Sequence, residues 1–216
     1  MMTIAIVDYG MGNLKSVAKA FMHVAPDQRI LITSDAKEIA EADRVVLPGQ
    51  AAMPESMVAL NDSGLRDVLL QASKDRPFFG VCLGLQMLFE ESEEGPTPSL
   101  GYLPGKSIRF PKPHFDKNGA PLKVPHMGWN ALTIPAHASA HPCWAGIAQE
   151  TAFYFANSYY AAPKESAVVA GTANYPDPIC VAVGKANLFA VQFHPEKSAD
   201  GGLRVLKNFS NWSGSL

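Results

Sequence analysis

Apolar runs in the first half of the chain alternate with stretches of helical periodicity. Continuous apolar runs, often β-branched, predict strands at residues 3–8, 29–33, 43–47 and 77–81. Apolar residues spaced three and four apart predict helices at 14–23 and 64–74. Strands that are apolar on both faces and separated by helices are typical of a parallel sheet covered by helices on both sides.

The pattern changes after Cys82. The spacing of Leu85, Leu88 and Phe89 predicts a helix that continues into the acidic stretch 90–94, which we interpret as a solvated helix face apart from Glu94. Prolines and glycines then become frequent and helical periodicity is weak between residues 95 and 142.

Short β-rich runs dominate the rest of the second half. They predict strands at 152–156, 166–172, 179–183 and 188–193, followed by a closing helix at 201–212. No repeat or linker divides the chain. We therefore expect a single α/β domain over residues 1–216, with a mostly parallel central sheet, helices on both faces and a β-rich second half.

Composition and charge narrow the classes of function. The 216 residues carry a formal net charge of −2 without a dense Lys/Arg cluster, so nucleic-acid and membrane-surface binding are not expected. No apolar run has the length of a membrane span, and the N-terminus lacks the features of a signal peptide. The three cysteines have no metal-type spacing, which favours a reducing cytoplasm and predicts neither metal nor cofactor.

Cys82 lies between two glycines at the predicted boundary between a strand and a helix. The segment Gly80-Val81-Cys82-Leu83-Gly84 has the pattern of a nucleophile elbow, with cysteine in place of serine. At the start of a helix, free N–H groups favour a thiolate, and the amide that follows can face a developing oxyanion. A small buried cysteine in a strand–helix turn is the alternative, and this segment alone leaves both interpretations open.

A cysteine nucleophile requires a base, and His194 directly follows an apolar strand, as Cys82 does. The carboxyl ends of parallel strands share one edge, so the two side chains should meet there. Glu196 follows after a proline and can orient the imidazole, which predicts a Cys–His–Glu triad. A surface turn is the alternative for the His-Pro-Glu segment, and the other histidines are expected to be structural or surface residues.

Together these residues resemble the triad-type class I glutamine amidotransferases. The resemblance rests on the G-x-C-x-G-x-Q elbow at residues 80–86 and on the F-H-P-E motif at 193–196. It implies a flavodoxin-like α/β fold and hydrolysis of the glutamine side-chain amide through a cysteinyl thioester. Cys82 would be the nucleophile, His194 the general base and then acid, and Glu196 the orienting carboxylate.

Three longer motifs narrow the resemblance. DYGMGNLKSV at 8–17, VPHMGWN at 124–130 and QFHPEKS at 192–198 are similar to the glutaminase subunits of imidazole glycerol phosphate synthase. The central motif separates them from the related glutaminases of vitamin B6 synthesis. This resemblance implies a heterodimer with a (β/α)8-barrel cyclase in histidine biosynthesis. The cyclase uses the ammonia to make imidazole glycerol phosphate and the carboxamide nucleotide AICAR.

The resemblance also implies roles for residues around the triad. The oxyanion would be held by the backbone amides of Gly49, Gln50 and Leu83. The glutamine-binding candidates are Gly49, Gln86, Glu94, Ser158 and Tyr159. The candidates for the interface with the cyclase are Asn13, Lys15, His126, Met127, Trp129 and Asn130. A tryptophan exposed on a loop would suit an aromatic anchor, whereas a core tryptophan is the alternative for Trp129.

Two positions depart from the family pattern. Ala51 stands where the family usually has glycine, so a positive φ there would cost roughly 1 kcal/mol or more. We therefore expect Ala51 to shift the balance between conformations of the oxyanion loop. Asn157 replaces a histidine commonly found before Ser-Tyr, and it cannot change charge near neutral pH.

Other functional classes remain open at this point. A free-standing cysteine hydrolase would not need Gln86 or the central motif, and it would act without a partner. A non-catalytic regulatory subunit is disfavoured because the triad is intact. The Gly10-x-Gly12 loop lacks the third glycine of a phosphate-binding fingerprint, which favours a strand-end loop that lines the site or faces the partner.

Overall fold

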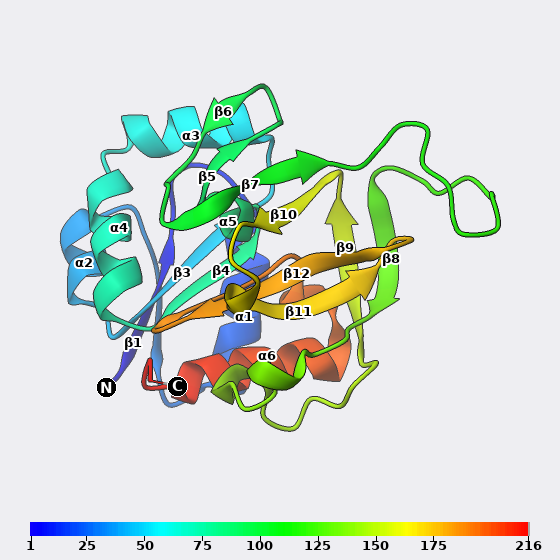
Figure 1. Cartoon of the computed structure of the whole chain (residues 1–216). Helices are drawn as coiled ribbons and strands as arrows, with labels where there is room; N and C mark the ends of the chain where they lie inside the picture. Colours follow the sequence, from blue (N-terminus) through cyan, green and yellow to red (C-terminus); the bar gives the residue numbers. More distant parts are fainter. Residues whose placement is uncertain (216) are drawn as a thin grey trace.

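The computed structural model describes residues 1–215, and its centre is an eleven-stranded sheet (Figure 1). Five strands run parallel in the order β2-β1-β3-β4-β13. They are β1 (Thr3–Val7), β2 (Arg29–Thr33), β3 (Arg44–Gly49), β4 (Phe78–Cys82) and β13 (Leu188–Val191). The order places β4 and β13, which precede Cys82 and His194 in sequence, side by side.

Helices cover both faces of the parallel strands because alternate strand residues point to opposite sides. On one face, Val46 and Phe79 lie in a core with α1 (Leu14–Val24) and α6 (Ala199–Asn211). On the other face, Val45 and Phe78 pack with α2 (Ala36–Glu41), α3 (Met53–Asp62) and α4 (Arg66–Asp75). The predicted parallel sheet with helices on both faces is confirmed.

The second half extends the sheet rather than building a separate one. The order continues β13-β12-β10-β7-β5-β6, and β11 pairs with β12. Most of these pairs are antiparallel, whereas β5 and β7 are parallel. The strands are β5 (Phe89–Ser92), β6 (Thr97–Pro98), β7 (Leu103–Arg109), β10 (Tyr159–Pro163), β11 (Val169–Asn174) and β12 (Pro178–Lys185).

A two-stranded ribbon and several single turns complete the fold. The ribbon joins β8 (His126–Ala131) to β9 (Ala152–Asn157). The short helices are α5 (Leu83–Gln86), η1 (Ala136–Ala138), η2 (Pro142–Trp144), η3 (Ser166–Val168) and η4 (Pro195–Lys197). No helix within residues 1–215 is long and apolar enough to cross a bilayer.

The prediction for the segment after Cys82 is wrong in one respect. The helix is a single turn, α5, and the acidic stretch lies largely on strand β5 instead of on a helix face. Phe89 pairs with Leu103 of β7, so sheet pairing far along the chain overrides the local helical spacing. Helices α2 and α3 and strands β5, β6, β7, β8 and β10 were not predicted. The remaining predicted strands and helices are present within a few residues.

Candidate active site

Cys82 ends β4 and directly precedes α5, as the elbow pattern predicts. Its backbone has φ 55° and ψ −110°, a left-handed conformation that is uncommon for a residue with a side chain. The next amide, of Leu83, begins a helix and has no acceptor within it. The strained turn therefore presents a sulfur beside a free backbone donor.

The glycines around Cys82 permit very close approach of neighbouring backbones. A Cβ atom added to Gly84 would lie 1.9 Å from the carbonyl oxygen of Leu47 on β3. A Cβ on Gly49 would lie 2.7 Å from the Cβ of Leu83 and 2.9 Å from the hydroxyl of Tyr9. Only hydrogen fits at these positions, so the elbow and the end of β3 are packed against each other.

His194 lies just past β13 and forms a buried pair with Glu196. Its Nδ1 is 3.0 Å from Oε1 of Glu196, and the two side chains are only 3% and 2% exposed. The other ring nitrogen, Nε2, is buried and has no hydrogen-bond partner of good geometry among residues 1–215. Glu196 thus fixes the ring through Nδ1 and leaves Nε2 without a partner among these residues, which is the arrangement that the predicted triad requires.

The electrostatics of His194 favour its charged form. Burial by itself would lower the pKa of the imidazole, but its interactions with Cys82 and Glu196 outweigh burial and raise the pKa. A histidine that favours its charged form beside the sulfur is what an ion pair of thiolate and imidazolium requires.

A cavity of about 100 Å³ opens next to the sulfur. It is lined by Gln50, Ala51, Cys82, Leu83, Gln86, Glu94, Ala156, Asn157 and Tyr159. This set contains both segments proposed for the oxyanion hole and three of the glutamine-binding candidates. The cavity is smaller than the pockets that hold drug-sized ligands, so its size suits a small substrate.

Two of the glutamine-binding candidates have structural partners in addition to their place in the cavity wall. Glu94 Oε2 accepts a hydrogen bond of 2.8 Å from the amide of Met53, at the start of α3. Gln86 Nε2 donates to the carbonyl of Tyr159 at 3.0 Å and to Oε1 of Gln192 at 2.9 Å. The other two candidates, Gly49 and Ser158, do not line the cavity.

The interface candidates differ in exposure. Met127 and Trp129 are 64% and 55% exposed, and Lys15 is exposed as well. The exposure of Trp129 rules out a core position and agrees with the anchor interpretation. The residue lies on strand β8 instead of on a loop. His126 is buried and stacks on Tyr175, with ring centroids 4.0 Å apart.

Two further interface candidates make local hydrogen bonds. Asn13 caps α1 by accepting from the amide of Ser16 at 3.4 Å. Asn130 Nδ2 donates to the carbonyl of Asn174 at 2.9 Å. Both side chains are partly buried, and each stabilises the chain's own fold through its hydrogen bond.

Both departures from the family pattern line the cavity. The backbone of Ala51 lies outside the left-handed region, so this conformation stores no strain at Ala51. Asn157 Nδ2 donates to the carbonyl of Tyr159 at 3.0 Å, and its buried Oδ1 has no partner among the described residues. The free oxygen is an acceptor available to a ligand.

Sequence reasoning missed two residues next to the sulfur. Gln192, completely buried, donates from Nε2 to Cys82 Sγ at 3.7 Å. Tyr9 is buried behind the oxyanion segment, and its hydroxyl donates to the carbonyl of Pro48 at 3.1 Å. Both residues belong to the motifs that carry the family resemblance, and these motifs were the only sequence signal that could have identified them. The motifs do not reveal their roles, because these depend on contacts between distant segments.

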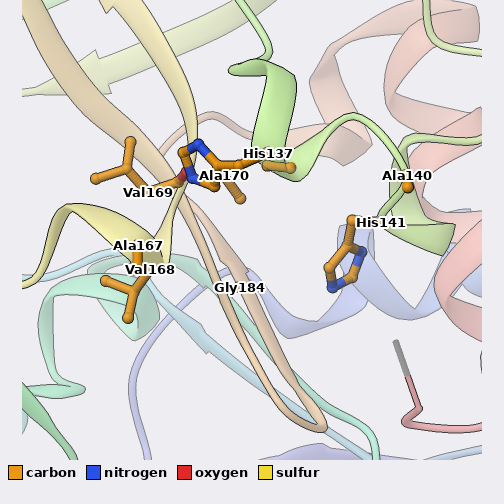
Figure 2. A pocket seen from close by; sticks show the side chains of 9 residues that line it. His137, Ala140, His141, Ala167, Val168, Val169, Ala170 and Gly184 are labelled. Atoms are coloured by element: carbon orange, nitrogen blue, oxygen red, sulfur yellow. The ribbon is translucent and has the colours of Figure 1, made fainter.

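A second cavity of about 150 Å³ lies among η1, η3 and the β11–β12 pair, and Figure 2 shows the side chains that line it. Its lining is mostly alanine and valine, with His137 and His141 as the polar members. Burial lowers the pKa of His141 to about 4. The lining contains neither a cysteine nor a carboxylate, so the triad chemistry belongs to the first cavity. No cluster of potential metal ligands occurs in the part of the chain that the structure describes.

Comparisons with known proteins agree with this geometry. The model of the family "Glutamine amidotransferase class-I" matches residues 5–211. The imidazole glycerol phosphate synthase subunit HisH of Aromatoleum aromaticum is 52% identical over 214 residues, covering 99% of this chain and 100% of the relative. The HisH subunit of Nitrosomonas europaea is 50% identical, with 99% and 100% covered.

Solved structures share the fold at low sequence identity. The glutaminase domain of Trypanosoma brucei CTPS, solved with bound acivicin, has a TM-score of 0.63 and 18% identity over 97% of this chain and 94% of its own. A structure described as a glutamine amidotransferase has a TM-score of 0.69 and 16% identity, with 95% and 98% covered. The chain therefore belongs to the class I glutamine amidotransferases and, within them, to the family of imidazole glycerol phosphate synthase HisH subunits.

Proposed function

We propose that the chain is the glutaminase subunit of an imidazole glycerol phosphate synthase. It hydrolyses glutamine to glutamate and ammonia and delivers the ammonia to a cyclase subunit in histidine biosynthesis. The full-length identity to HisH subunits supports the pathway. One geometric observation supports the chemistry. Cys82 and the buried His194–Glu196 pair lie at the ends of neighbouring parallel strands, beside one small cavity.

The first half-reaction forms a thioester. The Cys82 thiolate attacks the side-chain carbonyl carbon of glutamine, and the carbonyl oxygen takes up negative charge. The backbone amides of Leu83, Gly49 and Gln50 would hold this oxyanion, and Leu83 and Gln50 line the cavity beside the sulfur. His194 then gives its proton to the departing nitrogen, and the C–N bond breaks to release ammonia.

The second half-reaction hydrolyses the thioester. His194, now neutral, takes a proton from water, and the resulting hydroxide attacks the thioester carbon. The C–S bond breaks and its electron pair returns to sulfur. Glu196 keeps the proton-accepting Nε2 directed at the reacting atoms through its 3.0 Å bond to Nδ1. The net reaction consumes one water and produces glutamate and ammonia.

Substrate recognition and the partner complete the proposal. Gly49, Gln86, Glu94, Ser158 and Tyr159 remain the predicted glutamine-binding set. The exposed apolar side chains of Met127 and Trp129, with Lys15, would form part of the interface with a (β/α)8 cyclase. Glutamine is the substrate in this proposal, and the expectations of no nucleic acid, no membrane contact and no cofactor are retained.

The proposal also covers the domain boundaries and location. The family model over residues 5–211 supports one amidotransferase domain spanning 1–216. Cys82, Cys143 and Cys180 are all free thiols, in keeping with the predicted reducing cytoplasm.

The decisive experiment measures glutamate release by the purified chain, alone and with a cyclase subunit and its nucleotide ligand. The Cys82→Ala variant is the control. We expect little turnover by the chain alone, strong stimulation in the complex and none with Cys82→Ala. Strong activity of the isolated chain would instead identify an independent hydrolase. If no glutamate is released under any of these conditions, the chain is a non-catalytic subunit.

A further inference from the structure

Gln192 contacts the reactive sulfur, but the mechanism above gives it no role. It directly follows β13, and its own amide is fixed in the sheet by a 2.8 Å bond to the carbonyl of Val181. The side chain is completely buried and directs Nε2 at Cys82 Sγ, 3.7 Å away. A buried amide this close to a nucleophile must present either its N–H group or its oxygen to the sulfur, with opposite consequences for the sulfur's charge.

The neighbours of Gln192 decide which end of the amide faces the sulfur. The carbonyl oxygen of Tyr159 can only accept, so Gln86 must present its NH2 group there, at 3.0 Å. The same NH2 group donates to Oε1 of Gln192 at 2.9 Å, while Oε1 of Gln86 accepts from Ser107 Oγ at 3.1 Å. Gln192 therefore turns its oxygen toward Gln86 and its N–H group toward Cys82.

An N–H donor distinguishes the charge states of sulfur. A thiolate accepts a hydrogen bond far better than a neutral thiol, which is a weak acceptor. The Gln192 side of the sulfur, away from the cavity, is dry, because Gln192 and Ser107 have no exposed surface and Gln86 is 3% exposed. Loss of the donor would therefore remove one partner of the anionic sulfur on its buried side.

We propose that Gln192 is a catalytic residue that stabilises negative charge on Cys82 Sγ, with Gln86 acting as the positioning residue that fixes its amide. This role rests on the proposed glutaminase function. It applies twice in the cycle. The donor stabilises the thiolate before it forms the C–S bond, and it stabilises the sulfur again when that bond breaks and the electron pair returns.

Other titratable groups also lie around Cys82. His194 and Tyr9 interact with it, and Glu94 lies in the same cavity wall. All three remain in a variant of Gln192. A difference between wild type and variant therefore reports on the amide donor.

The test uses alkylation of Cys82 by iodoacetamide in the isolated chain, followed by mass spectrometry of the peptide that contains it. Gln192→Met keeps the size of the side chain but removes the donor. We expect its alkylation rate near neutral pH to fall about tenfold, the equivalent of one hydrogen bond to a charged group, and the rate profile to move to higher pH.

Gln149→Met is the matched control. Gln149 exchanges two 2.8 Å hydrogen bonds with the backbone of Ile134 and does not line the catalytic cavity. Its alkylation profile should coincide with that of the wild type. Gln192→Asn is the second variant, because it retains an amide for Gln86 but withdraws the N–H group from sulfur. It should reproduce the shift if Gln192→Met does not fold.

Glutamine turnover in the complex provides an independent readout. We expect kcat to fall about tenfold in Gln192→Met with KM unchanged, because the donor acts on sulfur and not on bound glutamine. An unshifted alkylation profile in a folded variant, or a rise in KM at constant kcat, would overturn the proposal. If wild-type complex does not hydrolyse glutamine, the proposed function fails, and alkylation still decides whether Gln192 controls the sulfur.

Discussion

His126 offers a quantitative test of how burial controls the protein's stability. The ring is 4% exposed and stacks between Phe155 and Tyr175, with centroids 4.9 and 4.0 Å away. Its Nδ1 has no partner within residues 1–215. Burial lowers the pKa of His126 to about 4, and it does the same for His141. Each imidazole is therefore neutral in the folded protein at neutral pH.

A lowered histidine pKa makes the folded state less stable in acid. The imidazole takes up a proton near pH 6.5 in the unfolded chain but only near pH 4 in the folded protein. Between these pH values the unfolded state binds more protons, so the free energy of unfolding decreases as the pH is lowered. From about pH 7.5 to about pH 5.5 the loss is roughly 1.3 kcal/mol for each such histidine. His194, with its raised pKa, has the opposite sign in this range.

The contribution of His194 cancels when a variant is compared with the wild type. We predict that His126→Phe, measured by urea unfolding, gains roughly 1.3 kcal/mol relative to wild type when the pH falls from about 7.5 to about 5.5. His141→Phe should show the same gain from a lower starting stability, because it also loses the 3.1 Å bond from the Cys143 amide. If the free energies of unfolding of variant and wild type differ by the same amount at both pH values, burial does not lower the pKa of His126.

The remaining predictions concern the catalytic centre and the partner. Glu196→Gln should lower glutamine turnover in the complex by roughly 10³-fold with little change in KM, and a loss below tenfold would contradict the triad. Gly84→Ala should lower the free energy of unfolding by about 3 kcal/mol or more and abolish turnover, because its Cβ would overlap a carbonyl of β3; an unchanged thermal midpoint would count against the close approach. Ala51→Gly should raise turnover in the complex up to about fivefold, since glycine enters positive φ more easily by about 1 kcal/mol, and identical rates would remove the idea. Trp129→Ala should weaken cyclase binding by about tenfold in a titration, whereas Val58→Ala, with 59% exposure, should bind like wild type.

Local sequence patterns predicted the parallel half of the fold well. Strands β1, β3 and β4 are almost wholly buried because helices cover both of their faces, and this pattern depends little on distant segments. The pattern failed after Cys82, where the three apolar residues at helical spacing, Leu85, Leu88 and Phe89, lead into strand β5. Pairing with β7 satisfies the backbone there, and the spacing of side chains cannot encode that partner.

Contiguous motifs in the sequence were enough to predict the triad of the candidate active site. The elbow glycines, Cys82 and the His-Pro-Glu turn are contiguous motifs whose local geometry follows from the residues themselves. Their meeting also followed from the sequence, since carboxyl ends of parallel strands share one edge.

The polar groups that surround the sulfur could be identified only from the folded chain. Gln86, Gln192 and the carbonyl of Tyr159 come from three distant segments, and the direction of each amide depends on the other two. The exposure of Trp129 and the burial of His126, two residues of the same motif, were likewise undetermined until β8 paired with β9. Hydrogen-bond direction and side-chain burial depend on what packs against a residue from elsewhere in the chain, and a linear pattern does not contain that information.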